Sequence, residues 1–313
     1  MKFEDIIDEL DSTYFSVSKQ LEESEAAMYR LLIKELKDLD LDKQGNIRTN
    51  AANIRKLAAI RSRMEGFIMN DDFQKAIETI VKSYITIARL QNQYFEQTIR
   101  DFKPSVITIE LRKQAADLVK QQLSTSVVEE VRTVIGQKLL TAVTSGMSYA
   151  DLQDDISRTL KGTGAEPGYI QKYSRTLATD SINTFSRQHM SLVASDLGYQ
   201  WYRYQGSLIE TSRPFCEAMV KKKWVHVSEF DDVIHGRFEE FRQMEDAKIN
   251  PKTKMPNGLK EETTAQNFKE LAGGWNCGHQ LRPVAEEDVP ANVRAITYQT
   301  DAYKRWKSLN NAE

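Results

Sequence analysis

The chain has 313 residues, with 43 Lys and Arg against 45 Asp and Glu, 40% hydrophobic residues and only two Cys. This composition excludes collagen-like, wholly disordered and disulfide-scaffold proteins, and the chain is long enough for one large or two modest domains with cores of their own. Its net charge of −2 provides no overall basic field, so binding to nucleic acid would need a local basic patch.

Targeting signals are absent from the pattern of the sequence. No run approaches the roughly 20 apolar residues of a membrane span, and the acidic start MKFEDIIDEL lacks the basic and apolar regions of a signal peptide. With only Cys216 and Cys277, a reducing compartment is the default. We therefore expect synthesis in the cytoplasm and no membrane partner.

The first 160 residues are typical of helices, because they contain a single Pro and four Gly among long runs with helical apolar periodicity. The caps Asn70 and Ser148 and the breakers Pro104 and Gly146 divide these runs. The predicted helices cover 3 to about 42, about 49–64, 71 to before Pro104, about 106–146, and a fifth from Ser148 to about 161.

Apolar residues in two of these helices recur at alternating intervals of three and four residues. Such a stripe is covered either by other helices of the same chain, as in a bundle core, or by another protein, and the sequence leaves both interpretations open. The stripe residues that we expect to contact a partner are Phe3, Ile7, Leu10, Tyr14, Val17, Phe73, Ile77 and Tyr84.

A change of composition separates this helical part, residues 1–161, from the rest. The Gly- and Pro-rich segment 162–168 is typical of a linker. After it, 169–197 predicts one more helix ended by Gly198, and 199–204 alternates aromatic and polar residues as a strand does. The predicted fold is therefore mostly α: a long-helix N-terminal bundle or arm, followed by a smaller α+β C-terminal domain.

Every Cys, His and Trp lies after residue 188. Two thiols and two imidazoles would satisfy the four-coordinate shell of a structural zinc. Two other interpretations stay open: the thiols are small buried hydrophobes under Trp224 and Trp275, or Cys216 and His279 form a nucleophile and its base. The zinc ligand candidates are Cys216, Cys277, His279 and either His226 or His235.

The order of motifs in the last third resembles the phage minor head proteins of the Mu F-like head morphogenesis family. In that family an Arg-rich helix leads to a strand, an "R-x-x-C" turn, and a closing "N-C-R-C" or "N-C-R-H" element before a hydrophobic-Pro ending. The matching residues here are Arg175, Thr179 and Arg187, then Gly198, Trp201 and Tyr204, then Arg213-Pro-Phe-Cys216 with Met219, and then Trp275-Asn-Cys-Gly-His-Gln-Leu-Arg-Pro283.

The resemblance covers residues 169–285, with Gly278 where Arg is usual and an insertion over 227–270, and leaves 286–313 as a tail. It implies a non-enzymatic structural protein of the virion, inside the head at the portal vertex. The implied partners are the portal protein, the major capsid protein or further copies of this chain, and packaged double-stranded DNA. The alternatives are a virion-carried nuclease or hydrolase that uses Cys216 and His279, and a zinc-stabilised DNA-binding module.

Overall fold

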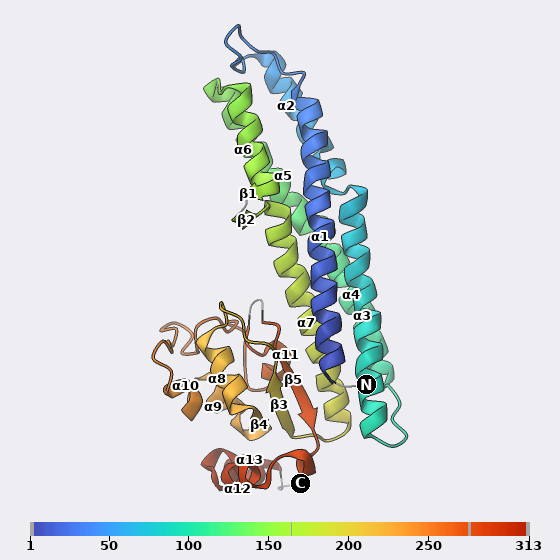
Figure 1. Cartoon of the computed structure of the whole chain (residues 1–313), viewed down its shortest axis with the longest axis vertical. Coiled ribbons are helices and arrows are strands. Elements are labelled where there is room, and N and C mark those ends of the chain that lie inside the picture. The colour runs from blue at the N-terminus through green and yellow to red at the C-terminus, as the bar shows by residue number, and fades with distance from the viewer. Residues whose placement is uncertain (1–2, 164, 275–276, 311–313) are drawn as a thin grey trace. The chain divides into compact units, whose positions relative to one another are not determined.

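In the computed structural model, which describes residues 3–163, 165–274 and 277–310, long helices make up most of the first two thirds of the chain (Figure 1). They are α1 (Phe3–Leu36), α2 (Ala51–Ile68), α3 (Asp71–Thr98), α4 (Val106–Gln122), α5 (Val128–Ser145), α6 (Tyr149–Lys161) and α7 (Tyr169–Asp196), and a π-helical turn, η1 (Leu123–Val127), joins α4 to α5. The predicted fold class is confirmed.

The last third combines short helices with a small sheet. The strands are β3 (Trp201–Gln205), β4 (Trp224–His226) and β5 (Gln280–Val284), in the antiparallel order β4-β3-β5. The helices are α8 (Pro214–Lys222), α9 (Phe230–Ile234), α10 (Glu239–Arg242), α11 (Phe268–Leu271), α12 (Ala291–Gln299) and α13 (Asp301–Asn310), with single 3-10 turns η2 (Val227–Glu229) and η3 (Glu286–Asp288).

The chain forms two compact units whose boundaries do not follow the predicted linker. One, here called the sheet unit, comprises residues 1–7, 87–112 and 180–313, and the other, the helical unit, comprises 8–86 and 113–179. The boundaries lie inside α1, α3, α4 and α7. Pieces of the N-terminal half therefore belong to the same compact unit as the C-terminal domain. Within it, Gln91 of α3 donates to the carbonyl (3.0 Å) and hydroxyl (2.7 Å) oxygens of Ser186 on α7.

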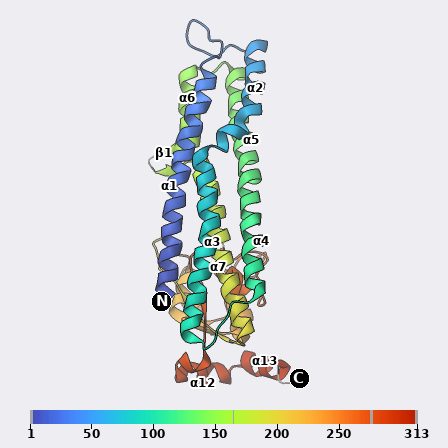
Figure 2. The same cartoon turned by 90° about the vertical axis from the view of Figure 1, so that its right-hand side faces the viewer.

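Within the helical unit, α2 and α5 run side by side (Figure 2). The predicted apolar stripes line the interior of the bundle, so the bundle-core interpretation is the one that the structure bears out. Among the residues predicted to contact a partner, Phe3, Leu10, Val17, Phe73, Ile77 and Tyr84 are buried within the chain and Ile7 and Tyr14 are half-buried. That prediction is wrong for the six buried side chains, since a buried core residue offers no surface to a partner. For Ile7 and Tyr14 it stays a prediction.

The apolar stripe of α1 also differs in its period from the prediction. A strict alternation of three and four places Ile7, Tyr14 and Leu31 on the stripe, whereas the structure buries Ile6 and Leu32, and Leu31 is 38% exposed. Intervals of four predominate towards Leu36. A mean interval above 3.5 residues matches a nearly straight helix and not the left-handed supercoil of a heptad repeat.

The π-turn η1 keeps the buried side chains of α4 and α5 on the same side of the helix. The buried side chains there recur at intervals of four, which exceeds the 3.6 residues of an α-helical turn and would rotate the stripe away from the core. A π-helical turn contains more residues per turn and returns the stripe to the core. Leu118 is 55% exposed, and the buried positions at intervals of four are Val119, Leu123, Val127, Val131, Ile135 and Leu139.

The predicted linker 162–168 contains a short hairpin instead of an extended segment. Its strands are β1 (Gly162–Thr163) and β2 (Glu166–Pro167), paired antiparallel. Gly162 has a φ of +74°, and a Cβ on it would lie 2.1 Å from the carbonyl oxygen of Glu166. The hairpin leads directly into α7, whose first turn donates a backbone N–H from Gln171 to the buried carboxylate of Glu25 at 2.7 Å.

This carboxylate gives the helical unit a predicted pH dependence. Burial, opposed by the backbone donors Gln171 and Ile170, raises the pKa of Glu25 from 4.5 to about 8. The folded chain then retains a proton that the unfolded chain releases, so folding stability falls as the pH rises from 4.5 to about 8. We expect Glu25→Gln, which keeps an acceptor without the charge, to be more stable than wild type at pH 9 by about 4–5 kcal/mol.

Urea unfolding at pH 5 and pH 9 measures this effect. The control is Glu23→Gln, because Glu23 is exposed on the same helix. Equal pH dependence in wild type and in Glu25→Gln would contradict the prediction.

Among the described residues, the sheet unit has one main apolar core, to which β3 contributes Tyr202 and Tyr204. The segment 227–270, predicted as an insertion into the resembled domain, contributes much of it: Phe215 of α8 contacts the rings of Phe238, Phe241 and Phe268 edge-on, with centroids 6.1–6.3 Å apart. Arg213 also donates to the carbonyl oxygen of Gly258 at 2.9 Å. The segment is therefore part of the core of this unit.

Candidate metal centre

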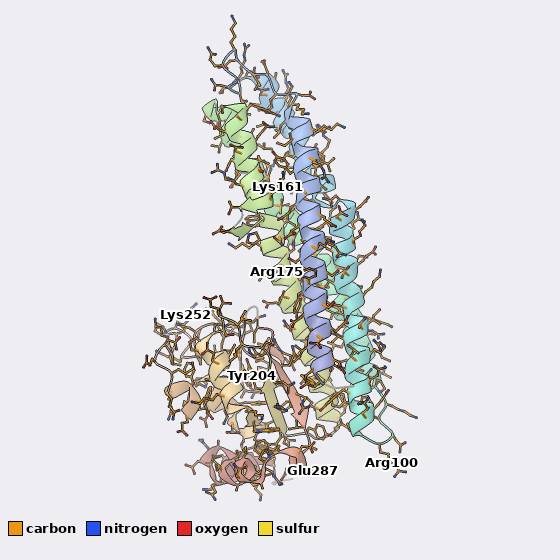
Figure 3. The ribbon with its side chains drawn as sticks, viewed as in Figure 1. Arg100, Lys161, Arg175, Tyr204, Lys252 and Glu287 are labelled. Carbon is orange, nitrogen blue, oxygen red and sulfur yellow. The ribbon has the colours of Figure 1, made fainter. Side chains whose placement is uncertain are left out.

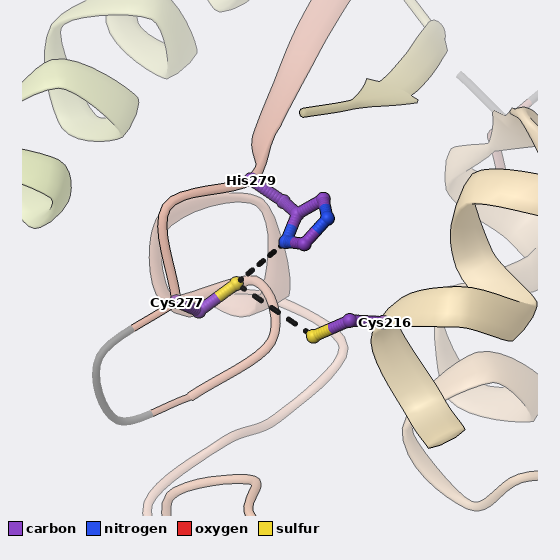
Figure 4. Close-up of side chains that lie close together, drawn as sticks. All are labelled: Cys216, Cys277 and His279. Atoms are coloured by element: carbon purple, nitrogen blue, oxygen red, sulfur yellow. Dashed lines mark hydrogen bonds between the residues drawn. The ribbon is translucent and has the colours of Figure 1, made fainter. Parts of the chain in front are cut away.

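Two thiols and one imidazole meet in the core of the sheet unit (Figure 4). The Sγ atoms of Cys216 and Cys277 lie 3.9 Å apart, and Sγ of Cys277 lies 3.6 Å from Nδ1 of His279. The three donor atoms are all within 4.8 Å of one another, and the three residues are 3%, 3% and 6% exposed. This cluster can hold a metal ion, as the sequence predicted for these three residues.

The local structure explains why these residues converge. Cys216 lies in the first turn of α8, which Pro214 opens at a position where a missing N–H costs nothing. Cys277 and His279 lie in the turn that enters β5, and the pairing of Gln205 with Gln280 brings that turn to the end of β3. His279 packs closely against Gly206, where a Cβ would lie 2.8 Å from the imidazole Cδ2.

A buried arginine holds the turn that carries two of the three donors. Arg187 of α7, which is 3% exposed, donates from Nε to the carbonyl oxygen of His279 at 3.0 Å and from Nη1 to that of Leu271 at 3.3 Å. Its Nη2 donates to the carbonyl oxygen of Cys277. The sequence analysis assigned Arg187 to the Arg-rich helix of the resemblance, and the structure shows what it binds.

The two thiols do not ionise alike. A hydrogen bond from Cys216 lowers the pKa of Cys277 well below its ordinary value, and His279 and Arg187 act in the same direction. The same hydrogen bond, together with burial, raises the pKa of Cys216. The two thiols therefore do not titrate independently of each other.

Tyr204 and Gly273 complete the cluster, and the sequence analysis did not assign either to it. The hydroxyl of Tyr204 lies 3.6 Å from both sulfur atoms, and its ring stacks on His279 with centroids 5.2 Å apart. A Cβ on Gly273 would lie 2.6 and 2.7 Å from the sulfurs of Cys277 and Cys216. The doubled glycine 273–274 was the available signal for this close approach.

His226 is not part of this cluster, and its assignment as a zinc ligand is wrong. It pairs with Trp201 across β3 and β4, whereas Tyr204 lies three residues further along β3, about 10 Å away. Its Nδ1 accepts from the backbone N–H of Ser228 at 3.2 Å. The alternative ligand His235 lies elsewhere too, with Nδ1 2.8 Å from the carbonyl oxygen of Asp231.

Aromatic side chains enclose His226 instead. Trp201, Tyr303 and Trp306 have ring centroids 4.8–5.1 Å from the imidazole, so the predicted amphipathic tail docks on the sheet unit through α13. Burial among these aromatic rings lowers the pKa of His226 from 6.5 to about 4. Since the folded state disfavours the imidazolium, folding stability is lost as the pH falls from 6.5 towards 4.

We expect a chain ending at Thr300, which lacks α13, to return the pKa of His226 towards 6.5, because removing Tyr303 and Trp306 opens the imidazole to water. A histidine NMR titration measures this. Leu309→Ala is the control, since Leu309 is 77% exposed on the same helix. A pKa near 6.5 in the intact chain would contradict the prediction.

The interpretation of the cysteines as small buried hydrophobes is right about their burial, since both are 3% exposed in the apolar core of the sheet unit. Trp224 packs with Trp201 in a separate small cluster and not on the thiols, while Trp275 lies outside the described residues. The predicted nucleophile pair is not formed either. The sulfur of Cys216 contacts the hydroxyl of Tyr204 and the sulfur of Cys277, and it is Cys277 that contacts His279.

Comparison of the chain with protein-family models, with curated proteins and with solved structures finds no match. Among the described helices, none is both long and apolar enough to span a membrane. The geometry of the cluster and the order of motifs around it therefore carry the functional argument.

Proposed function

We propose that this chain is a non-enzymatic structural protein of a tailed-phage head, of the minor head protein class, located inside the capsid at the portal vertex. One observation carries the proposal. Arg187, on the helix that begins the resemblance, donates to carbonyl oxygens of Cys277 and His279 in the motif that ends it. Motifs some 90 residues apart in the chain are thus joined by hydrogen bonds, as expected if they form one domain.

The burial of the cluster supports an architectural role. A nucleophilic thiol has to reach its substrate, whereas Cys216 and Cys277 are both 3% exposed among aromatic and aliphatic side chains. The donors make contacts with one another and with the turn that carries them. Such a site braces the unit that surrounds it.

We also propose zinc as the ion that this cluster binds. Two thiolate sulfurs and an imidazole nitrogen are the donors of structural zinc sites, which are buried and contribute directly to folding stability. The short distances between the donors suit a shared ion. Without an ion, two sulfurs and an imidazole would lie in an apolar core with few polar partners besides one another. Zinc would hold α8 and the turn before β5 together.

The proposed partners are the portal protein, the major capsid protein or further copies of this chain, and packaged double-stranded DNA. The chain's net charge of −2 gives DNA no overall attraction, and Lys222 and Lys252 are engaged with Glu229 (2.9 Å) and Glu261 (3.2 Å). We therefore expect contacts with protein to dominate over contacts with DNA.

The test is to locate the chain in purified particles of a phage that encodes it. We expect it to copurify with the portal in low copy number, and a phage lacking it to be rescued by the wild-type chain. Absence from intact particles would overturn the proposal. A Cys216→Ala chain that folds and loses only a measurable turnover would favour the virion-carried enzyme, and salt-dependent DNA binding by the isolated chain would favour the DNA-binding module.

A further inference from the structure

Tyr204 is a buried phenol whose hydroxyl has poor partners. The side chain is 1% exposed on the central strand β3 (Figure 3), and the described residues provide its hydroxyl with two hydrogen-bond partners, the sulfurs of Cys216 and Cys277. Both lie at 3.6 Å, and thiol sulfur is a weak acceptor. A buried tyrosine hydroxyl usually finds a strong hydrogen-bond partner, so this arrangement calls for another explanation.

Four of the distances among these donor atoms are close to those of a tetrahedral zinc shell, while the donor atoms of Cys216 and His279 lie within 4.8 Å of each other. With zinc bonds of about 2.3 Å to sulfur and about 2.0 Å to nitrogen or oxygen, two sulfurs lie about 3.8 Å apart, and a sulfur lies about 3.5 Å from a nitrogen or oxygen ligand. The sulfur–sulfur distance here is 3.9 Å, and the sulfur–nitrogen distance from Cys277 to His279 is 3.6 Å. Both sulfur–oxygen distances to Tyr204 are 3.6 Å.

We infer that the hydroxyl oxygen of Tyr204 is the fourth ligand of the zinc site, which makes it a site of two cysteines, one histidine and one tyrosine. This inference rests on the zinc proposed above. Among the described residues, no further Cys, His, Asp or Glu joins the three-residue cluster. Gly273 marks where the donors converge, since a Cβ there would lie within 3.0 Å of the Tyr204 oxygen and both sulfurs.

The charges around the cluster suit such a shell. On binding, the phenol and any protonated thiol release their protons to solvent, which leaves three anionic ligands and a neutral imidazole around a doubly charged ion. The resulting single negative charge faces two guanidinium groups. Arg187 acts electrostatically on Cys277, and Arg213, in the turn before α8, acts on Cys216.

The experiment adds zinc to the metal-free full-length chain and follows zinc affinity and the near-ultraviolet absorption of ionised tyrosine. Three chains are compared: wild type, Tyr204→Phe and Tyr202→Phe. Tyr202 is a matched control because it lies on the same face of β3, is also 1% exposed, and packs against Phe230 instead of the cluster. Circular dichroism establishes that each chain is folded before zinc is added.

We expect zinc to produce the tyrosinate band in wild type and in Tyr202→Phe but not in Tyr204→Phe. The Tyr204→Phe chain should also release one proton fewer per zinc and bind zinc at least about 100-fold more weakly, more than the loss of an outer-shell partner causes. Wild-type zinc binding with no tyrosinate band and no loss of affinity in Tyr204→Phe overturns the assignment of Tyr204 alone. Failure of the wild-type chain to bind zinc overturns the zinc proposal as well.

Discussion

Replacement of Cys277 by serine is expected to abolish stoichiometric zinc and to lower the unfolding free energy of the sheet unit by about 4 kcal/mol when free zinc is near 1,000 times its dissociation constant. The proposed zinc would stabilise only the folded chain, because its donors would come from α8 and from the turn before β5, with Cys216 and Cys277 separated by 61 positions in the sequence. Serine preserves the size of the side chain but not the thiolate ligand.

A metal chelator provides the decisive comparison for this prediction. Removing zinc from the wild-type chain should lower its unfolding midpoint to that of Cys277→Ser, and the chelator should then have no further effect on the variant. The measurement is denaturant unfolding with and without chelator, accompanied by metal analysis. Additive effects of chelator and substitution would mean that the thiol stabilises the core without a metal, which is the interpretation of the cysteines as small hydrophobes.

Replacement of Arg187 by methionine is expected to cost about 3–5 kcal/mol of unfolding free energy. The guanidinium donates to the carbonyl oxygens of Leu271, Cys277 and His279, and methionine would fill its space while leaving these buried acceptors without a donor. The turn that carries two metal ligands would also lose its support, so zinc affinity should fall together with stability.

The matched control for Arg187 is on the same helix. Arg175 of α7 is exposed (Figure 3), and Arg175→Met should change the unfolding free energy by less than about 0.5 kcal/mol. Arg187→Lys should be intermediate, since an ammonium keeps the charge but cannot reach three carbonyls in the planar arrangement of a guanidinium. Equal unfolding midpoints for Arg187→Met and Arg175→Met would contradict this account of the turn.

Some ends of the long helices could be predicted from the sequence, whereas the irregular turn within one of them could not. Asn70 accepts backbone N–H groups from Asp72 and Phe73 at the start of α3, as its capping position predicted, and Gly146 ends α5 with a φ of +67°. These features depend on neighbouring residues alone. The π-turn at 123–127 was not predicted, because the same apolar spacing is compatible with a slightly rotated α-helix until the position of the core is known.

Part of the candidate site could likewise be predicted from the sequence, and part could not. Residue types and their place late in the chain were enough to select Cys216, Cys277 and His279, which the structure brings together. Nothing in the sequence excluded His226 as a further ligand, or favoured Tyr204 over Tyr202. Those choices depend on which end of β3 each residue reaches, and strand register is set by pairing between segments that are distant in the chain.

The sequence by itself determined the helical class of this protein, the caps and breaks of its long helices, and the residue types of a thiol and imidazole site, because propensity, capping and ligand chemistry are local properties. The tertiary structure decided which apolar stripes are core, where the compact units divide, and that His226 and His235 lie away from the two thiols. Those outcomes arise from burial and from strand pairing between distant segments, whose energies no local pattern contains.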